Sequence, residues 1–368
     1  MKTVPQSAPQ STFWQGRRVL LTGHTGFKGS WLSLWLLELG AVVTGFSLAP
    51  ETDPNLFSQL GLERHLDHRL GDIRDAAVVA DLVQQVQPEV VLHLAAQPLV
   101  LRSYVTPAST WATNVMGTIH LLDALRTLRE PCTAVIVTTD KVYRNNEWLY
   151  GYREVDPLGG HDPYSSSKAA AEIAIASWRR SFCGSQPHQT PHLRVASARA
   201  GNVIGGGDWA VDRIVPDAMR ALAGGNPIGV RNPGATRPWQ HVLEPLGGYL
   251  LLAKRLACAN DPGSLASSFN FGPQLEANRS VRDLVEESLR HWPGSWLDQS
   301  DASSPHEANL LNLVIDKAHH QLGWAPRWPF ATTIERTVSW YRQVHETGDN
   351  ALDCCQNDLN LYLTSCPS

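Results

Sequence analysis

The first half of the chain alternates short apolar runs with longer segments whose apolar residues recur every three or four positions. The run at 88–95 is almost continuously apolar, as expected for a strand that is covered on both faces. Strands that alternate with helices predict βαβ units, a parallel sheet and helices on both of its faces. We therefore expect an α/β fold with a doubly wound parallel sheet of the Rossmann type. The predicted strands are 17–22, 41–48, 88–95, 134–139 and 194–203, and the predicted helices are 30–39, 76–86, 108–128 and 164–182.

This rhythm changes near residue 205, where glycine and proline cluster and the apolar runs become shorter. Helical segments at 246–258 and 281–292 follow, which indicates a smaller α/β lobe. We expect the following division: a flexible tail (1–15), a cofactor-binding Rossmann domain (16–204), a substrate-binding lobe whose chain returns to the Rossmann sheet (205–345), and a weakly patterned, peripheral tail (346–368).

Composition narrows the function classes. The 368 residues carry a formal net charge of −4, so the basic excess of a nucleic-acid-binding protein is missing. The six cysteines form no CxxC pair and have no histidine at metal-ligand spacing, which argues against a zinc or redox site. The most apolar segment, 30–39, is about ten residues long and contains Glu38, too short to cross a bilayer. We expect a cytoplasmic protein without a metal, a nucleic-acid partner or a membrane partner.

A glycine-rich loop follows the first predicted strand. Residues 22–29 read TGHTGFKG and lead directly into a predicted helix. In this context Gly23 permits a tight turn, Gly26 lets the backbone approach a pyrophosphate, and Gly29 permits close helix–strand packing. The phosphates would lie at the helix N-terminus, where N–H groups and the helix dipole favour negative charge. Glycine-rich turns also occur without a cofactor. The predicted cofactor contacts in this loop are Gly23, Thr25, Gly26, Phe27, Lys28 and Gly29.

Two further strand ends fit a dinucleotide. Asp72 follows a predicted strand end and could accept a hydrogen bond from an adenine amino group, and the small residues at 94–96 leave room for the cofactor. The second strand ends in Phe-Ser-Leu at 46–48, without the acidic residue that usually binds the adenosine ribose hydroxyls. Because Lys28 and Arg74 are nearby cations, both NAD and NADP remain open. The predicted contacts here are Asp72, Ile73, Leu94, Ala95 and Ala96.

A tyrosine and a lysine form the candidate catalytic pair. Tyr164 and Lys168 are four residues apart on a predicted helix and so share one face. An ammonium beside a phenol stabilises the phenolate and lowers the phenol pKa, which makes the tyrosine a possible base. The lysine could also hold the nicotinamide ribose. A solvent-exposed helix is the alternative, but the strand ending in Thr138-Thr139 just upstream favours an active site.

Taken together, the segments TGHTGFKG, GDI, HLAA, TNVMGT, TTD and YxxxK resemble the extended short-chain dehydrogenase/reductases that act on sugar nucleotides. The resemblance covers about residues 16–340 and implies NAD as the cofactor. It also implies that Asn114 fixes the active-site helix, a role compatible with capping a kink. Members often pair through four helices, which implies a homodimer or homotetramer built on 108–128 and 164–182.

Within this family, Asp140-Lys141 followed by Val-Tyr resembles the dehydratases that act on CDP-glucose, as do the segments TGHTGFKGSWL, HLAAQPLV, RAGNVIGGGDW and RPWQHVLEPLGGYL. The resemblance implies a lyase that forms CDP-4-dehydro-6-deoxy-D-glucose and water, for deoxysugars of surface polysaccharides such as lipopolysaccharide. Tyr164 would take the proton of the sugar 4-hydroxyl while hydride passes to NAD, and Asp140 would protonate the departing 6-hydroxyl. Lys141 would either remove the C5 proton or only orient Asp140. Thr139 is the neighbouring member of this catalytic set.

The substrate side rests on fewer residues. Arg237 matches the arginine that grips phosphate in this family, and a guanidinium suits that contact. Asn202 would touch the first phosphate or the sugar, or else serve only as a turn residue. Trp209 and His241 would contact the base or ribose, or belong to the local core, and Gln97 would face the mouth of the site. Arg213 and Arg231 are weaker phosphate candidates and fit solvated surface charges better.

Three functions remain in competition at this point. The first is the dehydratase above, and the second is another NAD-dependent sugar-nucleotide dehydratase or a 4-epimerase. The pair Asp140-Lys141 argues against an epimerase, which needs no acid and base for water loss. The third is a non-catalytic NAD-binding sensor, which the intact glycine loop and YxxxK pair disfavour.

Overall fold

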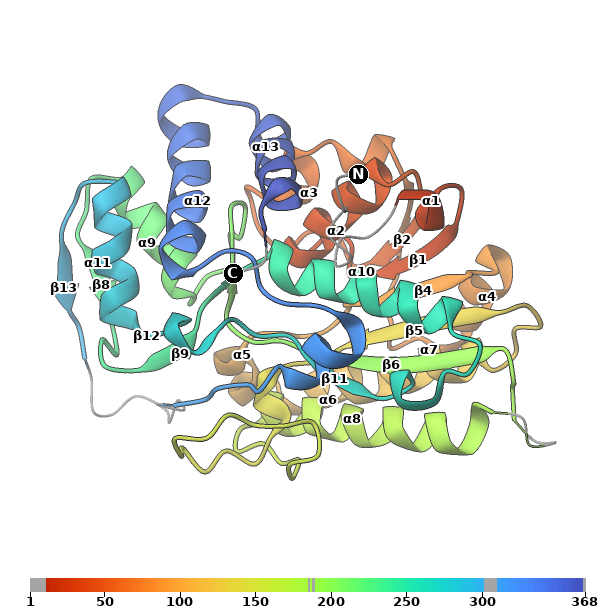
Figure 1. Cartoon of the computed structure of the whole chain (residues 1–368). Helices are drawn as coiled ribbons and strands as arrows, with labels where there is room; N and C mark the ends of the chain where they lie inside the picture. The colour runs from red at the N-terminus through yellow and green to blue at the C-terminus, as the bar shows by residue number, and fades with distance from the viewer. Residues whose placement is uncertain (1–10, 185, 187–188, 301–309, 367–368) are drawn as a thin grey trace.

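The protein is built around one seven-stranded parallel sheet (Figure 1). A computed structural model describes residues 11–184, 186, 189–300 and 310–366. The strand order is β11-β6-β5-β4-β1-β2-β3, so the order reverses between β1 and β4, where open α/β sheets bind ligands at their carboxyl ends. The predicted fold class is confirmed. The strands are β1 (Arg18–Thr22), β2 (Val42–Ser47), β3 (Asp67–Leu70), β4 (Val90–His93), β5 (Cys132–Val137), β6 (Leu193–Arg199) and β11 (Ser268–Asn270).

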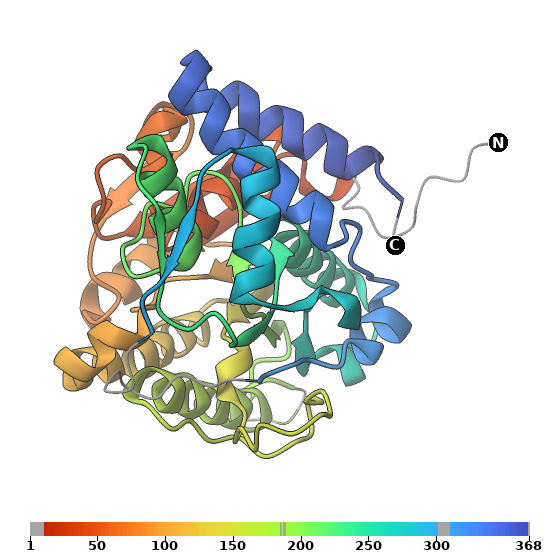
Figure 2. The same ribbon diagram turned by 90° about the vertical axis from the view of Figure 1, so that its left-hand side faces the viewer.

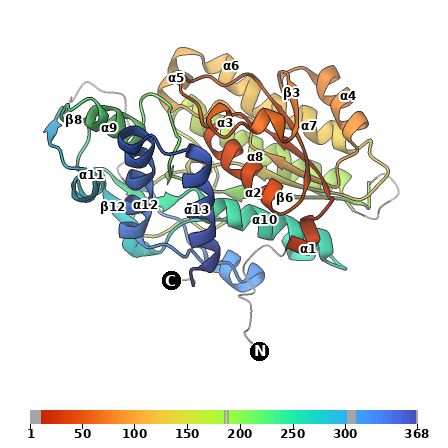
Figure 3. The same ribbon diagram turned by 90° about the horizontal axis from the view of Figure 1, so that it is seen from above.

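Alternating residues of the central strands pack into two separate cores, one on each face of the sheet. In β1, Val19 and Leu21 pack in the larger core, whereas Leu20 packs in the second core on the other face. The larger core includes α2 (Phe27–Glu38) and α10 (Leu243–Cys258), and the second is covered by α4 (Ala76–Val86), α7 (Gly117–Leu125) and α8 (Pro163–Phe182). Seen from above, α4 and α7 lie across the sheet from α10 (Figure 3). Both faces are therefore buried, which explains the continuously apolar strands.

The helix predicted at 108–128 is interrupted by a wider turn. It consists of α6 (Pro107–Trp111), a π-helical turn (Ala112–Met116) and α7. Such a turn shifts the side chains that follow it, and π-turns are frequent at functional sites. The helix predicted from residue 30 begins at Phe27 in the structure. The prediction missed its first turn because that turn contains Lys28 and Gly29 and carries no apolar periodicity. The remaining short helices are α3 (Leu56–Gln59) and α5 (Val100–Val105).

A smaller lobe lies at one end of the sheet (left in Figure 1, and facing the viewer in Figure 2). Among the described residues, three pairs of short strands, each strand two or three residues long, join its segments. After the lobe has begun, the chain returns to the sheet at β11, beside β6. The division at residue 204 remains a proposal. The lobe contains α9 (Ile214–Ala223), α11 (Val281–His291) and α12 (Phe330–Arg342), with the strand pairs β8 (Ile228–Val230) and β13 (Trp296–Asp298), β9 (Thr236–Pro238) and β12 (Asn278–Ser280), and β7 (Val203–Ile204) and β10 (Gln240–His241).

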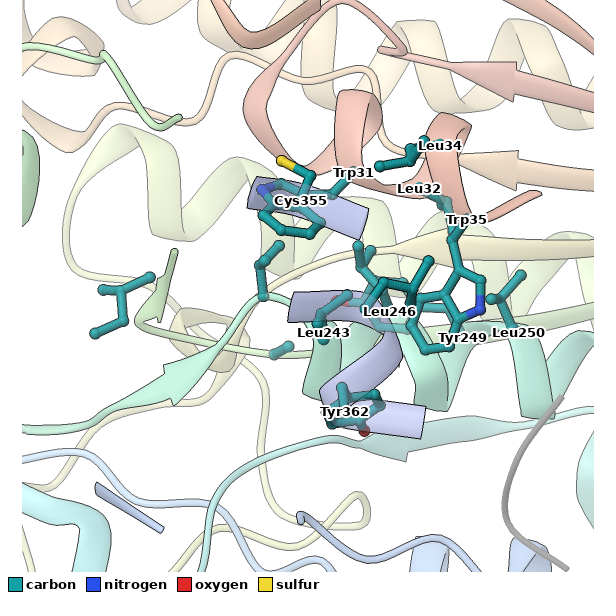
Figure 4. Close-up of a cluster of buried hydrophobic side chains, with 14 of the residues drawn as sticks. Trp31, Leu32, Leu34, Trp35, Leu243, Leu246, Tyr249, Leu250, Cys355 and Tyr362 are labelled. Atoms are coloured by element: carbon teal, nitrogen blue, oxygen red, sulfur yellow. The ribbon is translucent and has the colours of Figure 1, made fainter. Parts of the chain in front are cut away.

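The C-terminal segment corrects a prediction. We expected a weakly patterned, peripheral tail, but α13 (Ala351–Thr364) packs into the larger core, and its Cys355 and Tyr362 are buried (Figure 4). The Tyr362 hydroxyl donates to Glu244 Oε2 on α10 at 2.9 Å. Arg327 Nη1 donates to the carbonyls of Tyr362, Leu363 and Ser365 and so satisfies the helix C-terminus. The helix is thus tied to the core by specific polar contacts.

The N-terminal prediction is wrong in part. Residues 1–10 of the expected flexible tail lie outside the described residues. Within the rest, Trp14 at the end of α1 (Ser11–Trp14) is fully buried in the larger core. Among the described helices, none is long and apolar enough to cross a membrane.

Candidate active site

A cleft of about 2200 Å³ lies between the carboxyl ends of the strands and the smaller lobe. The structure brings most predicted site residues to its walls. Three predicted residues lie outside the lining, namely Asn114, Asp140 and His241. The predicted residues that do line the cleft are Gly23, Thr25, Gly26, Phe27, Lys28, Gly29, Asp72, Ile73, Leu94, Ala95, Ala96, Gln97, Thr139, Lys141, Tyr164, Lys168, Asn202, Trp209 and Arg237.

The glycine loop has the geometry that a pyrophosphate requires. Gly23 has φ +78°, and a Cβ there would lie 2.7 Å from the backbone N of Ala95. A Cβ on Gly29 would lie 2.0 Å from the carbonyl oxygen of Gly23, so the helix packs directly on the turn. At Gly26 the nearest atom to a Cβ is 3.5 Å away, and no described side chain caps the N-terminus of α2 there. The loop therefore fits a dinucleotide, since its open helix N-terminus can receive negative phosphates.

Hydroxyl groups occupy the end of β2, where an acidic residue is missing. Thr25 Oγ1 donates to the carbonyl of Leu48 at 2.9 Å and lies 2.9 Å from Ser47 Oγ. At the next strand end, Arg74 holds the Asp72 carboxylate through its Nε at 2.9 Å, which lowers the Asp72 pKa. Because this guanidinium is ion-paired, it is less available to a ribose phosphate than the sequence suggested.

Tyr164 and Lys168 lie on the cleft face of α8, which begins with Asp162 as its N-cap and Pro163 in its first turn. Burial raises the Tyr164 pKa to about 12, against the opposing effects of a hydrogen bond with Thr139 and the charge of Arg213. We predicted that Lys168 would lower this pKa, but in the structure burial dominates and Thr139 and Arg213 supply the leading opposing effects. The phenol is therefore neutral at neutral pH until a bound cation changes its surroundings.

Lys168 is buried next to the carbonyl of Val137 and near a buried polar cluster around Glu172. Its Nζ donates to the carbonyl of Val137 at 3.3 Å. Burial lowers the Lys168 pKa to about 8, and the carboxylate of Glu172, one helical turn further along α8, opposes that change. Glu172 is ion-paired with Arg199 at 2.8 Å and accepts a hydrogen bond from Thr138 Oγ1 at 2.6 Å. Sequence reasoning missed Glu172, although its spacing from Lys168 places it on the same helix face.

Asp140 and Lys141 follow β5 in a short 3₁₀ turn, beside Tyr164. Lys141 lines the cleft, whereas Asp140 is 1% exposed and lies behind the cleft wall. Asp140 Oδ1 accepts a hydrogen bond from Thr139 Oγ1 at 2.9 Å and lies 3.8 Å from Lys141 Nζ. Asp140 Oδ2 is buried without a hydrogen-bond partner among the described residues. The three residues thus form one polar cluster at the strand end.

Asn114 sits in the π-helical turn and reaches α8. Its Nδ2 donates to Ser167 Oγ at 2.9 Å, next to Lys168 in sequence, and its Oδ1 accepts from the backbone N of Gln97 at 2.9 Å. This arrangement supports the expected role of fixing the active-site helix. Gln97 lines the cleft, but its side chain is engaged locally with Leu99 and Thr110.

Asn202 adopts a left-handed backbone conformation with φ +46°, uncommon for a residue other than glycine. Its Oδ1 is buried without a partner among the described residues. Such strain combined with an unsatisfied oxygen in a cleft wall is typical of ligand-binding positions. Trp209 is engaged locally, since its Nε1 donates to Gln59 Oε1 at 3.1 Å and its ring packs edge-on against Tyr341.

Two interpretations of the substrate side are corrected. His241 is fully buried between Trp31 and Trp328, and burial lowers its pKa to about 3, so it is a neutral core residue. Arg213 lines the cleft, is only one-third exposed and pairs with Asp208 at 2.9 Å, so it is not a simple surface charge. Arg231 pairs with Asp212 at the cleft rim and remains half exposed.

Comparison with known proteins places the chain in a family. The sequence model of the GDP-mannose 4,6 dehydratase family matches residues 20–337, and the chain belongs to this family. Among individual relatives, the CDP-glucose 4,6-dehydratase of Salmonella typhimurium is 44% identical over 355 residues, which cover 96% of this chain and 98% of the relative.

Solved structures share the fold. The dTDP-glucose 4,6-dehydratase of Streptomyces venezuelae, solved with NAD bound, superposes with a TM-score of 0.73 at 26% identity and covers 89% of this chain and 97% of its own. The UDP-glucose 4-epimerase of Thermotoga maritima gives the same TM-score, 0.73, at 20% identity, covering 89% of this chain and 99% of its own. Because dehydratases and epimerases share this fold, the chemistry must be argued from the site.

Proposed function

We propose that the protein is a CDP-glucose 4,6-dehydratase, a hydro-lyase that converts CDP-D-glucose to CDP-4-dehydro-6-deoxy-D-glucose and water. One observation carries the proposal: Asp140 and Lys141 stand beside the Tyr164–Lys168 pair at the end of β5. Oxidation at C4 needs only the tyrosine and the lysine, whereas elimination needs a further acid and base on one side of the sugar. The resemblance to the Salmonella enzyme supports CDP-glucose as the substrate.

NAD is the proposed cofactor. The Gly23–Gly29 turn, the open N-terminus of α2 and the small residues at 94–96 would hold it, and a related dehydratase was solved with NAD bound. When bound, NAD supplies a reversible two-electron oxidation of the sugar. Arg74, the cation at the adenosine end, is ion-paired with Asp72 and is therefore less available to the ribose phosphate of NADP, which favours NAD.

The chain's own residues would handle the protons. Tyr164, deprotonated in the occupied site, would accept the proton of the 4-hydroxyl, and protonated Lys168, one helical turn further along α8, would stabilise the phenolate. The resulting 4-ketone acidifies the C5–H bond. Lys141, which lines the cleft, would either remove the C5 proton or only orient Asp140 or polarise the ketone, and protonated Asp140 would give its proton to the 6-hydroxyl as water leaves. Arg237 and Asn202 would hold the diphosphate and sugar.

A homodimer or homotetramer is part of the proposal. The π-helical turn, α6 and α8 pack against one another, and Trp111, Met116 and Ile173 on them are 41%, 45% and 61% exposed. Large exposed apolar residues on adjacent helices suit a second copy of the chain. A cytoplasmic location is supported by the six cysteines, all of which are free. The product would enter the synthesis of deoxysugars for surface polysaccharides.

The test is an incubation of protein and NAD with CDP-, UDP-, dTDP- and GDP-linked hexoses, read by mass spectrometry for the loss of one water. The proposal expects loss from CDP-glucose, abolished by Tyr164→Phe in a variant that keeps its thermal unfolding midpoint. Water loss from another nucleotide would keep the mechanism and overturn the CDP assignment. Interconversion of hexoses without water loss would favour the 4-epimerase, and bound NAD without any turnover would favour the sensor.

A further inference from the structure

Gly201 lies directly against the carboxylate of the proposed acid, Asp140. It belongs to the three-residue link between β6 and β7 and lines the cleft. A Cβ built on Gly201 would lie 1.9 Å from Asp140 Oδ2, 2.0 Å from Cγ and 2.4 Å from Oδ1. All three distances are below the 3.0 Å that real Cβ contacts respect. The carboxylate of Asp140 therefore occupies the space that any other residue at position 201 would fill with its side chain.

The backbone of Gly201 does not itself demand glycine. The glycines with left-handed φ in this chain include Gly23 and Gly207, but Gly201 is not one of them. A substitution there would meet no backbone strain of the kind that positive φ causes. The requirement for glycine at 201 is thus a requirement for space next to Asp140.

The link is also held firmly. Gln240, on β10, is 1% exposed, and its Nε2 donates to the carbonyl of Gly201 at 3.0 Å and to that of Phe271 at 3.0 Å. The next residue, Asn202, accepts a hydrogen bond from the backbone N of Gln240 at 3.3 Å. Gly201 cannot easily retreat from an added methyl group, so the carboxylate would have to move instead.

We propose that Gly201 is a positioning residue for the dehydration step, because its missing side chain creates the niche that holds the Asp140 carboxylate against Thr139 and Lys141. Asp140 is buried behind the cleft wall to which Gly201 belongs, so the space left at Gly201 sets how closely its carboxylate can approach a bound sugar. The inference rests on the proposed function, in which Asp140 protonates the departing hydroxyl. It adds a positioning residue in the β6–β7 link to the proposed acid and base, which follow β5.

The experiment compares Gly201→Ala, Asp140→Asn and the double variant with the unchanged protein. Gly234→Ala is the matched control, since Gly234 lies in the smaller lobe outside the cleft lining and a Cβ there meets no atom within 4 Å. With NAD and CDP-glucose, rapid mixing separates the appearance of reduced cofactor from the loss of water. Crystal structures of both glycine variants record where the Asp140 carboxylate lies, and thermal unfolding records whether each variant folds.

Gly201→Ala is expected to keep the fast appearance of reduced cofactor and to slow water loss on the order of 100-fold, as a displacement of about 1 Å can do. In the Asp140→Asn background the same change should cost no more than roughly threefold, because the two positions act through one carboxylate. The crystal structure should show the carboxylate displaced from the niche, while Gly234→Ala should leave both rates and the carboxylate unchanged.

The experiment distinguishes failure of the Gly201 niche from failure of the proposed role of Asp140. If Asp140→Asn slows water loss but Gly201→Ala resembles Gly234→Ala, or if its effect persists undiminished in the Asp140→Asn background, the niche is overturned and the proposed function stands. If Asp140→Asn turns over normally, the acid assignment is wrong. If the crystal structure of Gly201→Ala shows the Asp140 carboxylate in its original place, the niche is overturned.

Discussion

The buried ion pair of Glu172 with Arg199, near Lys168, allows a sharp stability prediction. Glu172 and Arg199 are 2% and 3% exposed and are paired at 2.8 Å. Changing Glu172→Gln removes the charge but keeps the shape of the side chain, and leaves the Arg199 guanidinium buried without its counter-charge. Removing one partner of a buried pair typically costs about 3–5 kcal/mol of unfolding free energy. We expect a loss of that size.

Two companion variants isolate the cause. Glu346→Gln breaks an exposed pair with Arg342, whose side chains are 41% and 46% exposed, and should cost at most about 0.5 kcal/mol. The double change Glu172→Gln, Arg199→Met removes both buried charges and should cost less than the sum of the two single changes. Urea unfolding followed by circular dichroism measures all of them. A loss below about 1 kcal/mol for Glu172→Gln would refute the reasoning that this buried charge is needed by its partner.

Three further outcomes follow from the same structure. Burial lowers the Lys168 pKa to about 8, and under the proposed function the protonated form would hold the cofactor ribose. NAD binding measured by tryptophan fluorescence should therefore weaken as pH rises through about 8; a flat profile would contradict this. Gly29→Ala places a methyl against the Gly23 carbonyl and should weaken NAD binding on the order of tenfold or more, measured by calorimetry; unchanged affinity would contradict the loop assignment. Tyr362→Phe leaves Glu244 Oε2 without its donor and should cost about 1–3 kcal/mol in urea unfolding, whereas no loss would mean that α13 is held by apolar contacts alone.

Features that depend on local pattern were accessible from the sequence. The helix predicted at 76–86 is observed over Ala76–Val86, because Asp75 caps it and its apolar residues repeat at helical spacing. The predicted strands correspond to β1, β2, β4, β5 and β6, where burial on both faces favours apolar runs, whereas no bounds were predicted for the polar, partly exposed β3 or for the three-residue β11. The glycine loop was found because Gly29 packs on the carbonyl of Gly23, a contact within one short segment, whereas the close approach of Gly23 to Ala95 is visible only in the structure.

Features that depend on distant contacts were not accessible. The sequence of α13 carries only a weak apolar pattern, and its burial comes from α10 and from Arg327, far away in the chain. His241 and Arg213 illustrate the same limit in the site. A histidine beside tryptophans is indistinguishable in sequence from a ligand-binding one until packing places Trp31 and Trp328 around it. Arg213 resembles a surface charge in the sequence until folding brings Tyr164 near it, in addition to its local partner Asp208.

The placement of the candidate residues separates the reaction from substrate choice. The proposed acid Asp140, the candidate base Lys141 and the niche at Gly201 lie at the ends of two adjacent strands, since the first two follow β5 and Gly201 follows β6. Adjacent parallel strands end at the same edge of a sheet, so these positions meet there, and Gln240 of the lobe fixes the Gly201 link in place. Arg237, in contrast, lies on β9 within the lobe, where the nucleotide would extend. Under the proposed function, substitutions at the two strand ends change which reaction follows C4 oxidation, whereas substitutions in the lobe change which nucleotide is accepted.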